Sequence, residues 1–76
     1  MKYELKNEDI ARLEKDFSYH PPKDDQPGRY VHLRDLAKAL AAEIMMNCPP
    51  SRERSLALTA LEECIMWANA SIARNE

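Results

Sequence analysis

The sequence predicts an all-α protein in which a short N-terminal helix precedes a long antiparallel helical hairpin. Apolar side chains recur at spacings of three and four residues, and two groups of prolines divide the chain into three segments. With 76 residues, of which 45% are hydrophobic, we expect a single helical domain spanning 1–76. A core this small is usually supported by a disulfide, a metal or a partner chain, and we expect a partner copy.

Residues 1–17 are expected to form an N-terminal extension and the first helix. Asn7 is the predicted N-cap, and the helix should run from about residue 8 to about residue 18 because acidic residues occupy its first turn and Ile10, Leu13 and Phe17 share one face. Pro21, Pro22, Pro27 and Gly28 are then expected to interrupt the helix. Residues 18–28 therefore form a predicted ligand loop that is stiffer than a glycine-serine linker.

The second helix is predicted over 29–48 and the third over 51–75. Pro49 and Pro50 should end the second helix, and Ser51 should cap the third. One apolar stripe marks each helix, and the two stripes should pack against each other in a hairpin. The stripes consist of Leu33, Ala37, Leu40, Ala41, Ile44 and Cys48 on the second helix, and Leu58, Leu61, Ile65, Ala68 and Ile72 on the third.

Apolar residues outside these stripes favour a homo-oligomer. They lie on both helices of the hairpin, where a single partner helix does not reach them. The alternative is that the first helix covers all of them. These residues are Leu36, Met45, Met46, Leu56, Met66 and Trp67.

Charge and cysteine content limit the classes of partner and compartment. A net charge of −2 disfavours a general DNA binder, which needs many basic contacts with phosphate. Cys48 and Cys64 lack metal-binding spacing and are expected to be reduced core thiols. No signal peptide or long apolar run is visible, so we expect a cytoplasmic protein without a membrane partner.

Catalytic and metal-site interpretations are disfavoured by residue spacing. His20, His32, Asp24 and Asp25 have suitable ligand chemistry for zinc but lack the i, i+3 or i+4 spacing of such sites. Cys48 has no neighbouring base in the sequence and fits an apolar stripe better than a nucleophile. We therefore predict no catalytic residue, no metal and no cofactor.

The loop also has the composition of a site for a nucleotide. Tyr19 precedes two prolines and could stack on a base, while Lys23, Arg29 and Arg34 could hold a phosphate near the start of the second helix. The alternative is that Tyr19 and Tyr30 pack over the end of the hairpin while the charged groups are solvated. The residue types alone do not decide between these interpretations.

A family resemblance favours the ligand site. The strings "YHPPKDDQPGRYVHLRDLAKALA" and "CPPSRERSLALTALEECIMWANASIARNE" resemble phage-encoded cyclic-oligonucleotide sponges that counter CBASS immunity, the second of the anti-CBASS families. The features that carry it are the "YHPP" loop with a downstream "RY", the start of the last helix and its closing "MWANA" segment. The resemblance covers 17–75.

The resemblance implies a homohexamer that binds cyclic dinucleotides such as cyclic GMP-AMP between protomers. Such proteins sequester the messengers in the cytoplasm of an infected bacterium and do not cleave them. On this chain, Tyr19 would stack on a base, Arg34 would contact phosphate, and His20, Pro21 and Lys23 would shape the loop.

Some members also hold cyclic trinucleotides in a second pocket, for which Arg74 and the residues around Leu36 are candidates. A different class of function remains open, namely a small helical adaptor or inhibitor that acts through protein–protein contacts.

Overall fold

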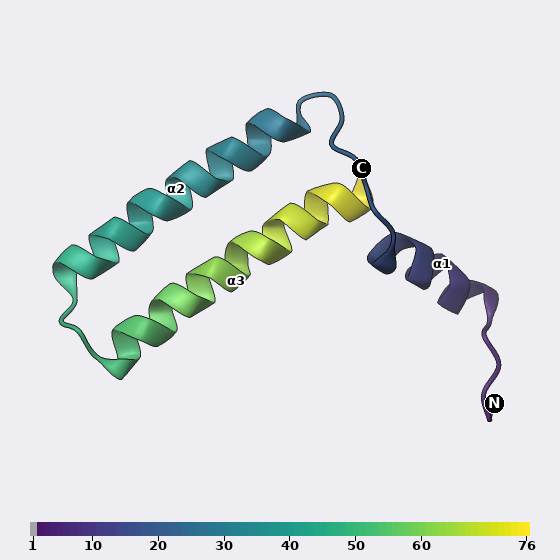
Figure 1. Cartoon of the computed structure of the whole chain (residues 1–76), viewed down its shortest axis with the longest axis horizontal. Coiled ribbons are helices and arrows are strands. Elements are labelled where there is room, and N and C mark those ends of the chain that lie inside the picture. Colours follow the sequence, from purple (N-terminus) through teal and green to yellow (C-terminus); the bar gives the residue numbers. More distant parts are fainter. Residues whose placement is uncertain (1) are drawn as a thin grey trace.

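The computed structural model describes residues 2–76 and contains three helices and no strand within that range. They are α1 (Asn7–Phe17), α2 (Gln26–Asn47) and α3 (Arg52–Asn75). Figure 1 shows α2 and α3 side by side and antiparallel, with α1 projecting beyond the end where α3 finishes. The predicted all-α architecture with a helical hairpin is confirmed. Within the described part of the chain, no helix combines the length and apolar character needed to span a bilayer.

The first helix begins one residue earlier than the sequence predicts. Lys6, and not Asn7, is the N-cap, with extended backbone geometry. The backbone N–H of Lys6 donates to the Asp9 carboxylate at 3.0 Å, so an acidic side chain satisfies a free amide at the start of the helix.

The second helix begins at Gln26, three residues before its predicted start. Pro27 and Gly28 were expected to interrupt the chain, but both lie in the first turn of α2. Proline is compatible with this position because its fixed φ suits a helix and its missing N–H would have no helical partner there. The loop that we predicted to bind a ligand is correspondingly shorter than 18–28 and ends at Asp25.

A short proline-containing link forms the closed end of the hairpin, residues 48–51. Cys48 is extended and caps α2, which therefore ends at Asn47, one residue before the prediction. The predicted capping by Ser51 is confirmed, since its Oγ accepts from the backbone N–H of Arg54 at 3.1 Å. The Arg54 guanidinium donates to the carbonyls of Met45 (3.2 Å) and Cys48 (3.1 Å), and so caps α2 from the neighbouring helix.

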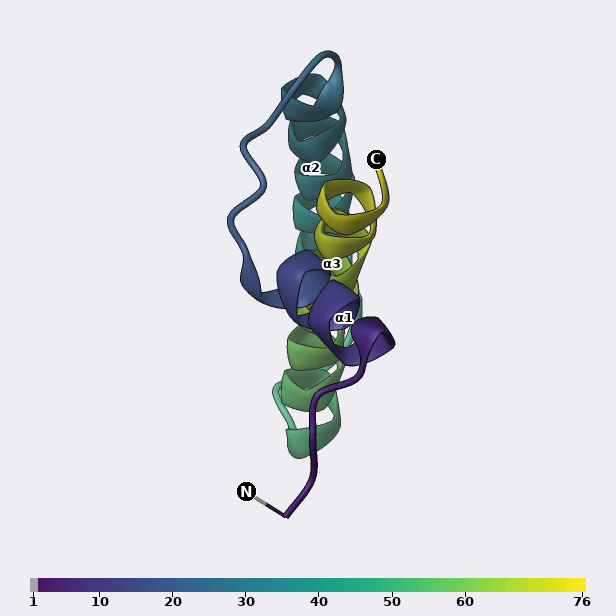
Figure 2. The ribbon, with the colours of Figure 1, turned by 90° about the vertical axis from the view of Figure 1, so that its right-hand side faces the viewer.

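The two predicted stripes meet along the hairpin, but they do not form a buried core. Most stripe residues of α2 and all five of α3 are half-buried, while Leu40 and Cys48 remain exposed. No apolar residue within 2–76 is fully buried. The chain is a thin layer measuring 51 × 37 × 13 Å, as the view in Figure 2 illustrates. Its radius of gyration is 17.2 Å, against roughly 11 Å for a compact domain of this length.

The cysteines are free but are not core residues, contrary to the sequence prediction. Cys48 and Cys64 are both exposed. Cys48 lies in the closed end, where the chain leaves the helix, and Cys64 lies on α3 outside the half-buried seam.

Helix α1 does not cover the remaining apolar surface. Its position beside α3 is marked by an ion pair between Arg74 and Asp16 at 3.8 Å, and Asp16 also pairs with Arg12 at 3.5 Å. Leu36, Met66 and Trp67 stay 57%, 67% and 63% exposed, so the first helix is not the partner that they lack.

Loss of the Ser51 cap should destabilise the hairpin. Ser51→Ala leaves the Arg54 amide without its acceptor, and we expect the free energy of unfolding to fall by about 1 kcal/mol. Thermal unfolding followed by circular dichroism measures this loss. Ser55→Ala is the matched control, because Ser55 is exposed inside α3 and its side chain has no partner within 2–76. Equal melting temperatures for the two variants would contradict the assigned cap.

Candidate ligand site

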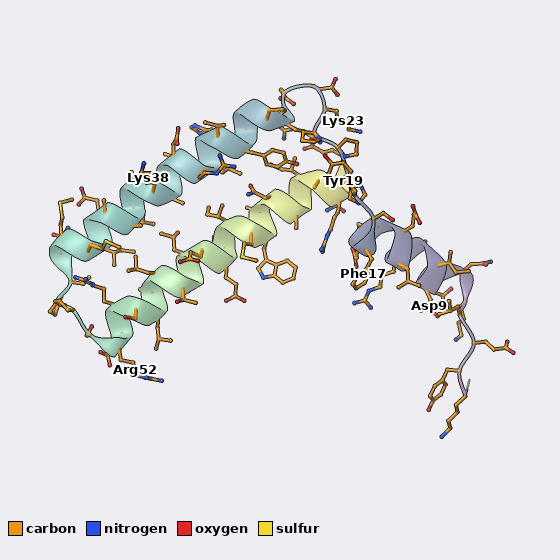
Figure 3. All side chains as sticks on the ribbon, viewed as in Figure 1. Asp9, Phe17, Tyr19, Lys23, Lys38 and Arg52 are labelled. Carbon is orange, nitrogen blue, oxygen red and sulfur yellow. The ribbon has the colours of Figure 1, made fainter. Side chains whose placement is uncertain are left out.

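A cavity lies at the open end of the hairpin, where the loop before α2 meets the last turn of α3. Its volume is about 350 Å³. Figure 3 shows Tyr19 and Lys23 in the loop beside the end of α3. The cavity is lined by His20, Pro21, Lys23, Gln26, Ala73, Arg74 and Glu76. Four residues predicted from the sequence, namely His20, Pro21, Lys23 and Arg74, therefore share one cavity.

Local bonds determine the path of the loop. The His20 Nε2 lies 2.6 Å from the carbonyl oxygen of Lys15, which connects the loop to the last turn of α1. Asp24 has a φ of 52°, a left-handed conformation that Asp tolerates better than most residues, and it reverses the chain before α2. Gln26 closes this turn, because its backbone N–H donates to the Lys23 carbonyl at 2.9 Å and its Oε1 accepts from the Lys23 N–H at 3.1 Å.

Glu76 joins the loop and α2 to the end of α3. Its carboxylate accepts from both terminal nitrogens of Arg29, with one contact of 2.8 Å, and from Gln26 Nε2 at 3.1 Å. The ammonium group of Lys23 donates to the backbone carbonyl of Glu76 at 2.7 Å. Arg29 also donates to Asp25 at 3.1 Å, across one turn of α2. We call the contacts of Glu76 with Lys23, Gln26 and Arg29 the Glu76 latch.

The latch shifts the pKa values of Glu76 and Arg29. Hydrogen bonds from Arg29 and Gln26 lower the pKa of Glu76 from its ordinary 4.5 to about 2. The contact with Glu76 raises the pKa of Arg29 above its already high ordinary value. Because the pKa of Glu76 is lowered, its ionised carboxylate stabilises the folded state. This stabilisation is complete above pH 4.5 and is lost as the pH falls towards 2. The latch is therefore fully charged at neutral pH.

Tyr19 and Arg34 do not line the 350 Å³ cavity. The Tyr19 side chain is exposed, with 83% of its surface accessible. Arg34 lines a second cavity of about 310 Å³ with Tyr30, Asn69, Ala70 and Ala73. The two cavities adjoin because Ala73 lines both of them. Arg34 forms no hydrogen bond or ion pair with any residue in 2–76.

Asn69 provides a further polar group beside Arg34. The Oδ1 of its side chain is shielded from solvent and accepts no hydrogen bond from the described residues. A lone polar residue in an apolar helical seam can form a buried hydrogen bond, and within this protomer Asn69 Oδ1 forms none. A buried amide oxygen without a donor is costly, so the position suits a donor from a ligand or from another chain.

The chemical groups at the open end are of a kind that can contact a ligand. Residues 2–76 contain no group of three or more His, Cys, Asp or Glu side chains positioned to hold a metal. Cys48, considered above as a nucleophile, lies at the closed end of the hairpin, opposite the loop that carries His20 (Figure 1). The open end instead offers an exposed ring, an unpaired guanidinium and adjoining cavities.

Two residues of the site were missed from the sequence. Gln26 was assigned to the loop although it is the first residue of α2 and only 3% exposed. No local sequence pattern pointed to Glu76, since its partners lie 47 to 53 positions earlier in the chain. The pairing of Asp25 with Arg29 could have been found, because oppositely charged residues four apart meet on a helix surface.

Comparison with known proteins identifies the family of this chain. No curated protein matches the chain, and no solved structure matches it. One family model, described as Acb2/Tad1, hairpin domain, matches residues 9–73. The match includes most of α1, the complete loop and α2, and nearly all of α3, which is well over half of the chain. The protein therefore belongs to the Acb2/Tad1 hairpin-domain family, a family of anti-CBASS sponge proteins.

Proposed function

We propose that the protein binds and sequesters the cyclic dinucleotide messengers of bacterial CBASS immunity, and also cyclic trinucleotides, without cleaving them. The observation that carries this proposal is the family match over 9–73, which includes the hairpin and the loop that line the open-end cavity. The cytoplasm of an infected bacterium is the proposed place of action, because the messengers are made there.

The side chains at the open end suit the parts of a cyclic dinucleotide. Tyr19 presents an exposed aromatic face to a base. Arg34 offers a guanidinium without an anionic partner in residues 2–76, and a guanidinium can hold a phosphate through two parallel hydrogen bonds. His20 and Pro21 shape the loop, and Arg74, the candidate contact for cyclic trinucleotides, lines the same cavity as these two residues.

Binding without cleavage is tested by recovering the ligand. We expect cyclic GMP-AMP to bind with a Kd near nanomolar, about −12 kcal/mol, because a sponge must bind below the activation threshold of the host effector. After denaturation, chromatography should return the intact cyclic nucleotide. Linear or mononucleotide products in excess of one equivalent per site would instead indicate an enzyme.

Removing the stacking ring or the free guanidinium should weaken binding. Tyr19→Ala should cost about 1–3 kcal/mol for one lost base stack, and Arg34→Ala roughly 1.5–3 kcal/mol for a charge-assisted hydrogen bond. Isothermal titration calorimetry measures both losses. Tyr3→Ala and Arg52→Ala are the matched controls, since Tyr3 is 81% exposed in the N-terminal segment and Arg52 begins α3 at the closed end. If Tyr19→Ala and Arg34→Ala bind the nucleotide with the same Kd as the control variants, Tyr19 and Arg34 do not contact it.

We further propose that the protein is a homo-oligomer, with six copies, and that nucleotides bind between protomers. The protomer exposes large apolar side chains on both helices of the hairpin. An open groove of about 510 Å³ crosses the α2–α3 seam. A second copy would cover this groove and supply the apolar contacts that a layer of two helices lacks. The groove is lined by Arg34, Ala37, Lys38, Ala41, Met45, Leu58, Leu61, Glu62, Ile65 and Met66.

A charge at Trp67 should disrupt this assembly. Trp67→Glu would place a carboxylate on the exposed apolar surface that we expect another copy to cover, and we expect smaller particles or loss of folding. Multi-angle light scattering in the presence of reductant gives the mass, and circular dichroism reports folding. Arg52→Glu introduces the same side chain in the first turn of α3, outside the exposed apolar surface, and should keep the parent mass. A monomeric parent protein at micromolar concentration would contradict the oligomer and favour the adaptor alternative.

A further inference from the structure

The Glu76 latch and the neighbouring Asp25 together contain four charged side chains, whose charges sum to zero. Lys23 and Arg29 provide two cations, while Asp25 and Glu76 provide two carboxylates. Every one of these groups has a partner of opposite charge or a strong acceptor within the chain. A phosphate that approached this cluster would therefore meet cations that are already compensated, in contrast with Arg34.

A phosphodiester would gain little by displacing Glu76 from Arg29. Each phosphodiester group carries one negative charge, as the ionised Glu76 carboxylate does, so the exchange would leave the number of ion pairs unchanged. Glu76 is also tethered at the end of α3, which gives it an effective local concentration on the order of millimolar. The exchange would in addition break the bond between Glu76 and Gln26, which is 3.1 Å long.

The latch fixes the segment that leads from the loop into α2. It attaches Lys23, Gln26 and Arg29 to Glu76, the residue that follows α3, and Gln26 in turn holds both backbone groups of Lys23. Tyr19 lies four residues before Lys23, and two prolines between them restrict the backbone. Release of the latch would free the end of this stiff segment and so change the position of Tyr19 relative to Arg34.

We propose that Glu76 is a positioning residue that holds the ligand loop, and that Lys23 and Arg29 bind Glu76 instead of the nucleotide phosphate. This inference rests on the proposed function and assigns different roles to the cations of the site. Arg34 contacts the phosphate, whereas Arg29 and Lys23 act through the loop.

The test compares Glu76→Gln with Glu63→Gln. Each variant loses one carboxylate, but Glu63 is exposed on α3 and has no partner within residues 2–76. Calorimetry with cyclic GMP-AMP gives the Kd, and amide hydrogen exchange of the ligand-free protein reports opening of residues 19–29. For Glu76→Gln we expect faster exchange in that segment and binding weakened roughly three- to tenfold. Glu63→Gln should match the parent protein in both measurements.

A double variant separates positioning from direct contact. Arg29→Gln in the Glu76→Gln background should weaken binding no further, because the ion pair between Arg29 and Glu76 is already lost. Glu76→Asp keeps the carboxylate and should recover part of the affinity and part of the exchange protection. Circular dichroism shows whether each variant keeps the helix content of the parent, and Glu76→Asp decides the question if Glu76→Gln does not fold.

Three results would overturn the proposal. Tighter binding by Glu76→Gln would show that Glu76 competes with phosphate for Arg29. Further weakening in the double variant would show that Arg29 contacts the ligand. Unchanged hydrogen exchange over residues 19–29 would show that Glu76 does not hold the loop. This last measurement needs no nucleotide, so it tests the latch even if the parent protein binds no cyclic dinucleotide and the proposed function fails.

Discussion

The apolar seam between α2 and α3 limits how much apolar surface this protomer can bury. Two helices in a single layer can shield each other along one line only, so the residues of the seam are half-buried and none is enclosed. Burial of apolar surface is the main favourable contribution to folding, and in this protomer much of the apolar surface stays in contact with solvent. The polar contacts at the two ends of the hairpin therefore have an unusually large share in fixing how the helices pair.

The two ends of the hairpin are built differently, and the candidate site lies at only one of them. At the closed end, four residues connect the helices and the Arg54 guanidinium caps α2 from α3. At the open end, the chain does not connect α2 to α3 directly, and the Glu76 carboxylate forms the bridge through Arg29. The adjoining cavities lie at this second end, where a loop can approach two helix ends at once.

Most of the fold was predictable because helix periodicity and proline positions are local signals. The three helices were located to within three residues at every boundary, and the largest error arose because Pro27 and Gly28 were interpreted as a break and not as a first turn. Burial was less predictable: the stripe that includes Cys48 is longer than the surface that α3 covers. Of the predicted site residues, His20, Pro21, Lys23 and Arg74 line one cavity, although Arg74 had been assigned to a separate pocket. The contacts of Glu76 could not be predicted from the sequence, because they depend on the lengths and register of both helices.

The position of the open end also has a mechanical consequence. The helices are fixed to each other by a short link at 48–51, and each extends from there for more than twenty residues. A small change in the angle at that link would therefore become a large displacement at the far end, as in a pair of tweezers. Local opening needs the least free energy where contacts are few and solvent is near. Separation of the two helices would therefore begin at the open end, where the Glu76 carboxylate and not the chain joins them.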